Sequence, residues 1–123
     1  MSVKNRNSIV TDGLVFYVDA SNPNSYPGSG TTWTDMVSSN IGTLTNGPSF
    51  DSGNGGSIDF DGSNDRTDFP DNSSFKPTGS MTLLVWAKGQ SGSTSIGIIG
   101  ALGSSGNRGY FMGCNTTQFR FSI

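Results

Sequence analysis

The segment MTLLVWAK, residues 81–88, is the most apolar run of this chain and decides the fold that the sequence predicts. Near its middle it carries apolar side chains at both odd and even positions, so both faces of an extended strand would be apolar there. Strands of this kind belong in the centre of a sheet that is covered on both sides. We therefore expect residues 81–88 to form a central strand, with Trp86 in the core rather than serving as a ligand platform.

Short strand patterns separated by turn signals occur on either side of this segment. Residues 14–20 alternate between apolar and polar positions and predict a first core strand. A long loop follows at residues 21–32, which are rich in Asn, Pro, Ser and Gly. Further strands are expected at 41–45, 57–61, 66–69 (a polar edge strand), 96–102, 109–113 and 118–123.

The composition agrees with an all-β chain. It includes 20 Ser, 18 Gly, 12 Thr and 11 Asn, about half of the 123 residues, while Glu and His are absent. Most strong helix formers are therefore rare or missing. This length suits one domain, which we place at 13–123 after an N-terminal arm at 1–12.

Charge and hydropathy narrow the range of partners. The net charge is −2 and the seven basic residues are scattered, which disfavours a nucleic-acid surface. No apolar run reaches the ~18 residues of a membrane span, so we expect no membrane insertion. The N-terminus shows no signal-peptide core, and Cys114, the single cysteine, has no intrachain partner. We expect synthesis in a cytoplasm and a fold that needs no disulfide.

Four segments together resemble a known family. They are GLVFYVDASNPNSYPGSGTTWTD (13–35), GTLTNGPSF (42–50), GGSIDFDGSNDRTDF (55–69) and MTLLVWAKG (81–89). Their order resembles the concanavalin A-like, laminin-G-like jelly-roll domains, especially those in structural proteins of tailed phages of marine bacteria and cyanobacteria. The resemblance covers about residues 12–123. It implies two antiparallel sheets packed face to face, a fold that is used for binding sugars or proteins and only sometimes for hydrolysis.

The chain departs from this family in ways that bear on assembly. Members of the family continue with further strands beyond the one that resembles residues 118–123, so we expect a jelly roll that lacks its C-terminal strands. We consider three explanations for the missing strands. Another subunit supplies them, the sheet ends against a larger assembly, or the chain is an incomplete product. Arg66 stands where members of the family often carry an aromatic residue, and the loop after Asp35 has less Gly than the same loop usually has in the family. A seven-stranded immunoglobulin-like sandwich is the alternative fold.

An acidic cluster is the candidate metal site. It consists of Asp59, Asp61, Asp65 and Asp68, and Ca²⁺ prefers several such oxygen ligands. The alternative is that Asp61 and Asp65 hydrogen-bond the backbone of a turn centred on Gly62, with Asp59 in solvent.

The first long loop is the candidate carbohydrate site. Asp19 and Asn22 would bond sugar hydroxyls, while Tyr26 and Trp33 would stack on apolar sugar faces. The alternative is that Trp33 is a core plug and the loop is scaffold.

The missing residue types argue against catalysis. Without His there is no imidazole base, and without Glu a paired-carboxylate glycosidase would need Asp alone. Asp59 and Asp61 can share one strand face, but nothing in the sequence would raise the pKa of either one. Together with the resemblance to phage structural proteins, this implies a non-enzymatic virion protein, for decoration or a fibre, that assembles with other virion proteins or copies of itself and contacts host polysaccharide. The alternative is a lectin-like adhesion module.

Overall fold

The computed structural model describes residues 9–89, 95–101, 109–115 and 118–122, and within them the chain forms eight strands and two short 3₁₀ turns. The strands are β1 (Thr32–Thr34), β2 (Ile41–Thr45), β3 (Ser49–Asp51), β4 (Ser57–Asp59), β5 (Arg66–Asp68), β6 (Ser95–Gly100), β7 (Phe111–Asn115) and β8 (Phe119–Ser122). The turns are η1 (Gly53–Gly55) and η2 (Ser73–Phe75). The described part contains no α-helix, so the all-β prediction is confirmed. No helix in these ranges is long and apolar enough to cross a membrane.

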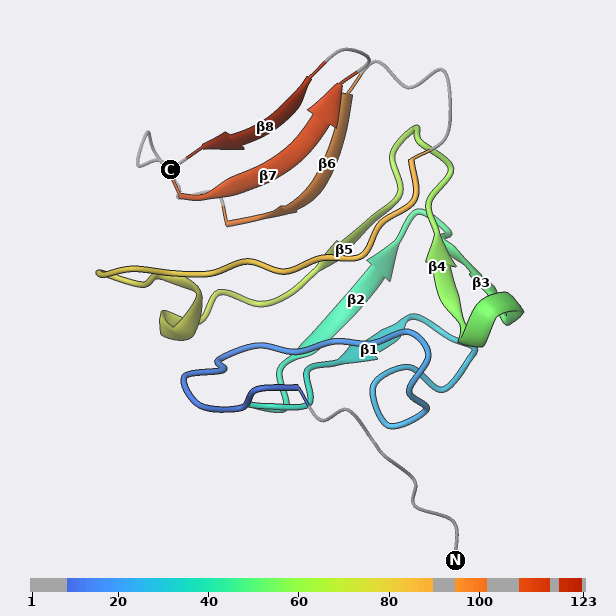
Figure 1. Ribbon diagram of the computed structural model, residues 1–123. Coiled ribbons are helices and arrows are strands. Elements are labelled where there is room, and N and C mark those ends of the chain that lie inside the picture. Colours follow the sequence, from blue (N-terminus) through green and yellow to red (C-terminus); the bar gives the residue numbers. More distant parts are fainter. Residues whose placement is uncertain (1–8, 90–94, 102–108, 116–117, 123) are drawn as a thin grey trace, which may run out of the picture.

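The strands form three antiparallel sheets, ordered β1-β2-β5, β3-β4 and β6-β7-β8 (Figure 1). The expected strand at 41–45 is β2, the centre of the first sheet, and the expected polar edge strand is β5. Asn46 and Gly47 follow β2 with φ of 70° and 106°, the positive angles that an Asn-Gly hairpin turn requires. The predicted strands at 57–61, 96–102, 109–113 and 118–123 are also present, with shifted ends.

Residues 14–20 do not form the predicted strand. Two hydrogen bonds at Tyr17 hold them instead. Its N–H donates to Asp35 Oδ1 at 2.9 Å, and its C=O accepts from Met36 N–H at 2.8 Å. A strand needs a ladder of backbone partners, and one of these two bonds goes to a side chain.

Residues 81–88 do not form the predicted central strand either. In Figure 1 the segment is a long trace without an arrow, coloured yellow to orange. No described residue makes a backbone hydrogen bond with it. Burial alternates only in its first half, where Met81 and Leu83 are half-buried and Thr82 and Leu84 exposed, while residues 85–88 are all exposed.

The buried apolar interior is small. Among the described residues, Tyr26 and Leu44 are the large apolar side chains classed as buried. A second cluster is aromatic, in which Phe16 lies edge-on to Phe69 at 4.9 Å and to Phe75 at 5.2 Å between ring centres. Strand-to-strand contacts in this part of the chain fall almost entirely within sheets. Most of the predicted arm at 1–12 lies outside the described residues.

Candidate functional site

The four candidate calcium ligands have different surroundings. Asp59 ends β4 in an exposed position. Asp65 Oδ2 accepts from Asp61 N–H at 3.0 Å, and Asp61 Oδ1 accepts from Ser63 N–H at 2.8 Å. These two carboxylates therefore bind the backbone of the turn at Gly62, as the alternative interpretation expected.

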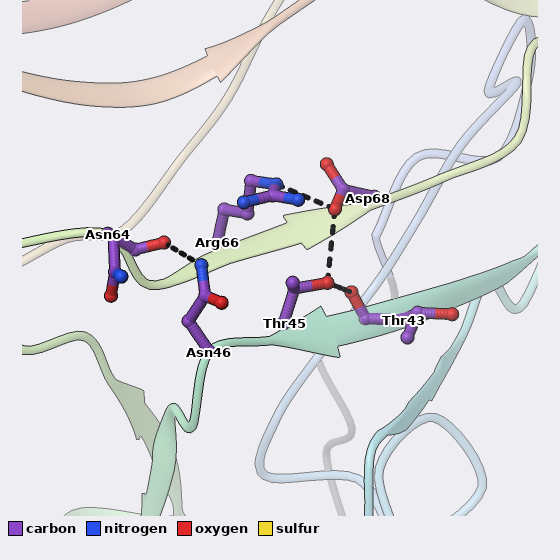
Figure 2. A network of polar contacts seen from close by, with 6 residues as sticks. All are labelled: Thr43, Thr45, Asn46, Asn64, Arg66 and Asp68. Atoms are coloured by element: carbon purple, nitrogen blue, oxygen red, sulfur yellow. Dashed lines mark hydrogen bonds and ion pairs between the residues drawn. The ribbon is translucent and has the colours of Figure 1, made fainter.

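Asp68 takes part in a separate polar network between β2 and β5 (Figure 2). Its Oδ2 accepts from Arg66 Nε at 2.8 Å and from Thr45 Oγ1 at 3.1 Å. Next to these contacts of Asp68, Asn46 Nδ2 donates to the Asn64 carbonyl at 2.7 Å. Within the described ranges, no group of three or more Asp, Glu, His or Cys side chains is gathered as a metal site. The structure therefore does not bring the four carboxylates together.

The candidate carbohydrate residue Tyr26 is placed in the interior. Only 3% of it is exposed, its hydroxyl donates to the Gly30 carbonyl at 2.9 Å, and its ring centre lies 5.4 Å from that of Phe50. A buried ring has no free face for a sugar, so the prediction that Tyr26 stacks on a ligand is wrong. Trp33 is half-buried in β1, with Nε1 buried and without a hydrogen-bond partner in the described part.

Asp19 and Asn22 use their side-chain oxygens within their own loop. Asp19 accepts from the Tyr17 hydroxyl and from both the N–H and the hydroxyl of Ser21. Asn22 Oδ1 accepts from Asn24 N–H at 3.0 Å. Partial burial raises the pKa of Asp19, but hydrogen bonds from Ser21 and Tyr17 lower it more, so its net pKa is below the ordinary value. Both residues act as loop scaffold.

Among the described residues, the side chain that accepts the most hydrogen bonds is that of Asp35, which is not one of the predicted site residues. Asp35 is 0% exposed and follows β1 directly. Its Oδ1 accepts from the N–H groups of Tyr17 and Val37 at 2.9 and 3.0 Å. Its Oδ2 accepts from Ser38 N–H at 3.3 Å, from the Ser38 hydroxyl and from Asn40 Nδ2 at 3.5 Å. An Asp followed three residues later by Ser is a local turn signal that could have indicated it.

These bonds keep Asp35 ionised. Burial raises the pKa of its carboxyl, but the bond from the Ser38 hydroxyl and those from the amides of Tyr17, Val37 and Ser38 outweigh burial and lower it overall. The carboxylate therefore joins the 14–20 segment to β1 as a structural anchor.

Buried Ser25 makes a second link of the same kind. It is 1% exposed, and its hydroxyl accepts from Asp19 N–H at 3.0 Å and donates to the Thr34 carbonyl at 2.7 Å. Because it joins residues 19 and 34, the loop and β1 form one hydrogen-bonded unit.

The apolar segment 81–88 takes no part in these buried hydrogen bonds, and it leaves large apolar side chains exposed. Leu84 is 82% exposed and Trp86 94%, so the prediction that Trp86 lies in the core is wrong. Trp86 and Lys88 border a groove of about 380 Å³ whose far side is formed by Asn54 and Ser57. The segment also borders an open cavity of about 3090 Å³, which shares Trp86 and Lys88 with the groove.

This cavity is too large for a small-molecule site, for which about 300–1,000 Å³ is usual. Protein interiors are close-packed and contain few voids larger than a water molecule. The cavity is therefore an open space between segments of the described chain, bordered among others by residues 81–88.

Comparisons with known proteins give this chain no relatives. No family model matches it, no curated protein matches it, and no solved structure matches it.

Proposed function

We propose that this chain is a non-enzymatic structural subunit of a tailed-phage virion, made in the host cytoplasm, that completes a jelly-roll sandwich with strands from neighbouring subunits. The observation that supports assembly with neighbouring subunits is the uncovered segment 81–88, in which Leu84 is 82% and Trp86 94% exposed. The sequence resemblance to phage jelly-roll proteins supports the virion setting. Copies of the chain or other virion proteins would be the neighbours.

Strand addition is the mode of assembly that suits this segment. An extended peptide can pair with a free strand edge, where backbone hydrogen bonds give affinity and alternating side chains give specificity. Residues 81–88 offer backbone groups without described partners, apolar side chains and no acidic residue. In isolation such a strand is an aggregation hazard, so a protein that keeps it exposed needs a covering partner.

Hydrogen exchange tests whether the segment is uncovered. In the dilute, unassembled chain we expect the amides of residues 81–88 to exchange within a factor of about ten of an unstructured peptide, because no backbone partner protects them. Mass spectrometry of peptides from this segment measures the rate, with β2 and its two partner strands as the protected reference. A dilute monomer with slow exchange across 81–88 would contradict the proposal.

A second candidate function is lectin-like binding of polysaccharide, favoured by the position of Trp86. Its exposed ring borders the groove formed with Asn54 and Ser57, so an aromatic face and short polar side chains lie together. Such a pair suits a sugar, which has apolar faces and hydroxyl edges. This site differs from the predicted one on the first long loop.

For this second function we expect Trp86→Ala to abolish glycan-array signals, because the stacking face is removed. Phe119→Ala is the matched control, since Phe119 is an exposed aromatic in β8 (67%) that does not border the groove. Signals that survive Trp86→Ala, or that Phe119→Ala removes equally, would rule out this groove as the site.

A further inference from the structure

We propose that residues 81–88 pair with the same residues of a second copy of this chain, antiparallel and with Val85 opposite Val85 on a two-fold axis. This inference rests on the proposed function and names its first partner. Most soluble homo-oligomers are two-fold dimers in which one surface patch meets itself, so a self-complementary strand is sufficient to form one.

The two-residue period of an extended strand defines the two faces of residues 81–88. Thr82, Leu84, Trp86 and Lys88 share one face by period two, and this face includes the two most exposed large apolar side chains of the described part. On the other face Met81 and Leu83 are half-buried, and Val85, at 36%, is much less exposed than Leu84 or Trp86. The partner must therefore match the face that carries Leu84 and Trp86.

A two-fold axis at Val85 makes this face complementary to itself. It places Leu84 of each copy opposite Trp86 of the other, and aromatic–aliphatic pairs of this kind stabilise neighbouring strands. An axis at Leu84 would place Trp86 opposite Thr82, and an axis at Trp86 would place Leu84 opposite Lys88. Only the Val85 register pairs the two exposed apolar side chains with each other.

Charge favours the same arrangement. In the Val85 register Lys88 lies opposite Thr82, and the two Lys88 residues are about 20 Å apart, at roughly 3.3 Å per residue, beyond the range of strong repulsion. A parallel, in-register pair would place the two lysines on neighbouring strands about 5 Å apart, where like charges destabilise. The antiparallel pair is therefore the arrangement that this strand accepts without a charge conflict.

Disulfide trapping tests the register directly. In a Cys114→Ser background, Val85→Cys places two thiols on the axis, with Cα atoms about 4.5–5.5 Å apart, inside the range that a disulfide spans. Thr82→Cys is the control, since its two copies are about 20 Å apart in this register. Mild oxidation should yield a cross-linked dimer for Val85→Cys and about tenfold less or none for Thr82→Cys, as seen on a non-reducing gel.

Analytical ultracentrifugation of the unmodified chain separates this inference from the proposed function. Self-pairing predicts a dimer that Leu84→Lys dissociates. Val10→Lys is the matched control and should leave the dimer intact, because Val10 is 81% exposed, as Leu84 is, but lies outside the segment. An oligomer in which Val85→Cys cross-links no better than Thr82→Cys overturns this register and leaves assembly intact. If the chain is a monomer at all concentrations and residues 81–88 exchange fast, self-pairing is wrong, and the proposed function then requires a different partner. If it is a monomer in which these residues exchange slowly, both self-pairing and the proposed function are wrong.

Discussion

Replacing Asp35 with Asn is expected to lower the free energy of unfolding by about 3 kcal/mol, because buried donors then lose their acceptor. The substitution keeps the shape of the side chain but turns one oxygen into an NH₂ group. If that group takes the place of Oδ2, it faces the Ser38 amide, the Ser38 hydroxyl and Asn40 Nδ2, which are all donors. Urea unfolding followed by tryptophan fluorescence measures the loss.

Asp71→Asn is the matched control for this experiment. The side chain of Asp71 is 76% exposed and pairs with Lys76 on the surface. An exposed ion pair contributes at most about 1 kcal/mol, so the control should stay close to the unmodified chain. Equal losses for the two variants would contradict the role of Asp35 as an anchor.

The same carboxylate predicts how stability depends on pH. Because its pKa is lower in the folded chain than in the unfolded chain, Asp35 adds stability above its unfolded pKa and loses it as pH falls through the folded one. We expect the unmodified chain to lose stability below about pH 4. Asp35→Asn should show a shallower loss over this range, measured as the urea midpoint at successive pH values.

Gly42→Ala is expected to destabilise the first sheet by about 2–3 kcal/mol through overpacking. Gly42 lies in β2, and a Cβ atom there would come within 2.5 Å of the Phe69 ring. The ring cannot move away freely, because Phe16 packs against it edge-on at 4.9 Å. Thermal unfolding followed by circular dichroism should show a clearly lower midpoint.

Gly79→Ala provides the control for the glycine substitution. No atom lies within 4 Å of a Cβ added at Gly79, so this change should leave the midpoint almost unchanged. If Gly42→Ala unfolds at the same temperature as Gly79→Ala, the close approach of Phe69 to β2 is wrong.

The sequence predicted the short strands well because their signals are local. Residues 41–45 and 57–59 lie in strands, and a turn with positive φ follows Thr45. Alternation and turn residues act over a few positions, so they can be read without knowing the fold. The turn roles of Asp61 and Asp65 were open to the same kind of reasoning, and the structure shows both.

The sequence failed where a feature depends on distant partners. Residues 14–20 and 81–88 carry clear strand patterns but have no ladder among the described residues. Tyr26 is an aromatic residue in a polar loop and so suits sugar stacking by sequence, yet its ring packs against Phe50 and its hydroxyl bonds the Gly30 carbonyl. A pattern of side chains shows which face is apolar but not what covers it.

The sequence by itself determined the all-β class, the positions of the turns and the absence of His and Glu chemistry, because these follow from residue types and short spacings. Tertiary structure alone decided that Asp35 is the anchor, since one of its donors, Tyr17, lies 18 residues away. It also decided that residues 81–88 are uncovered. Burial and hydrogen bonding are satisfied by neighbours in space, and the chain brings those neighbours together only when it folds.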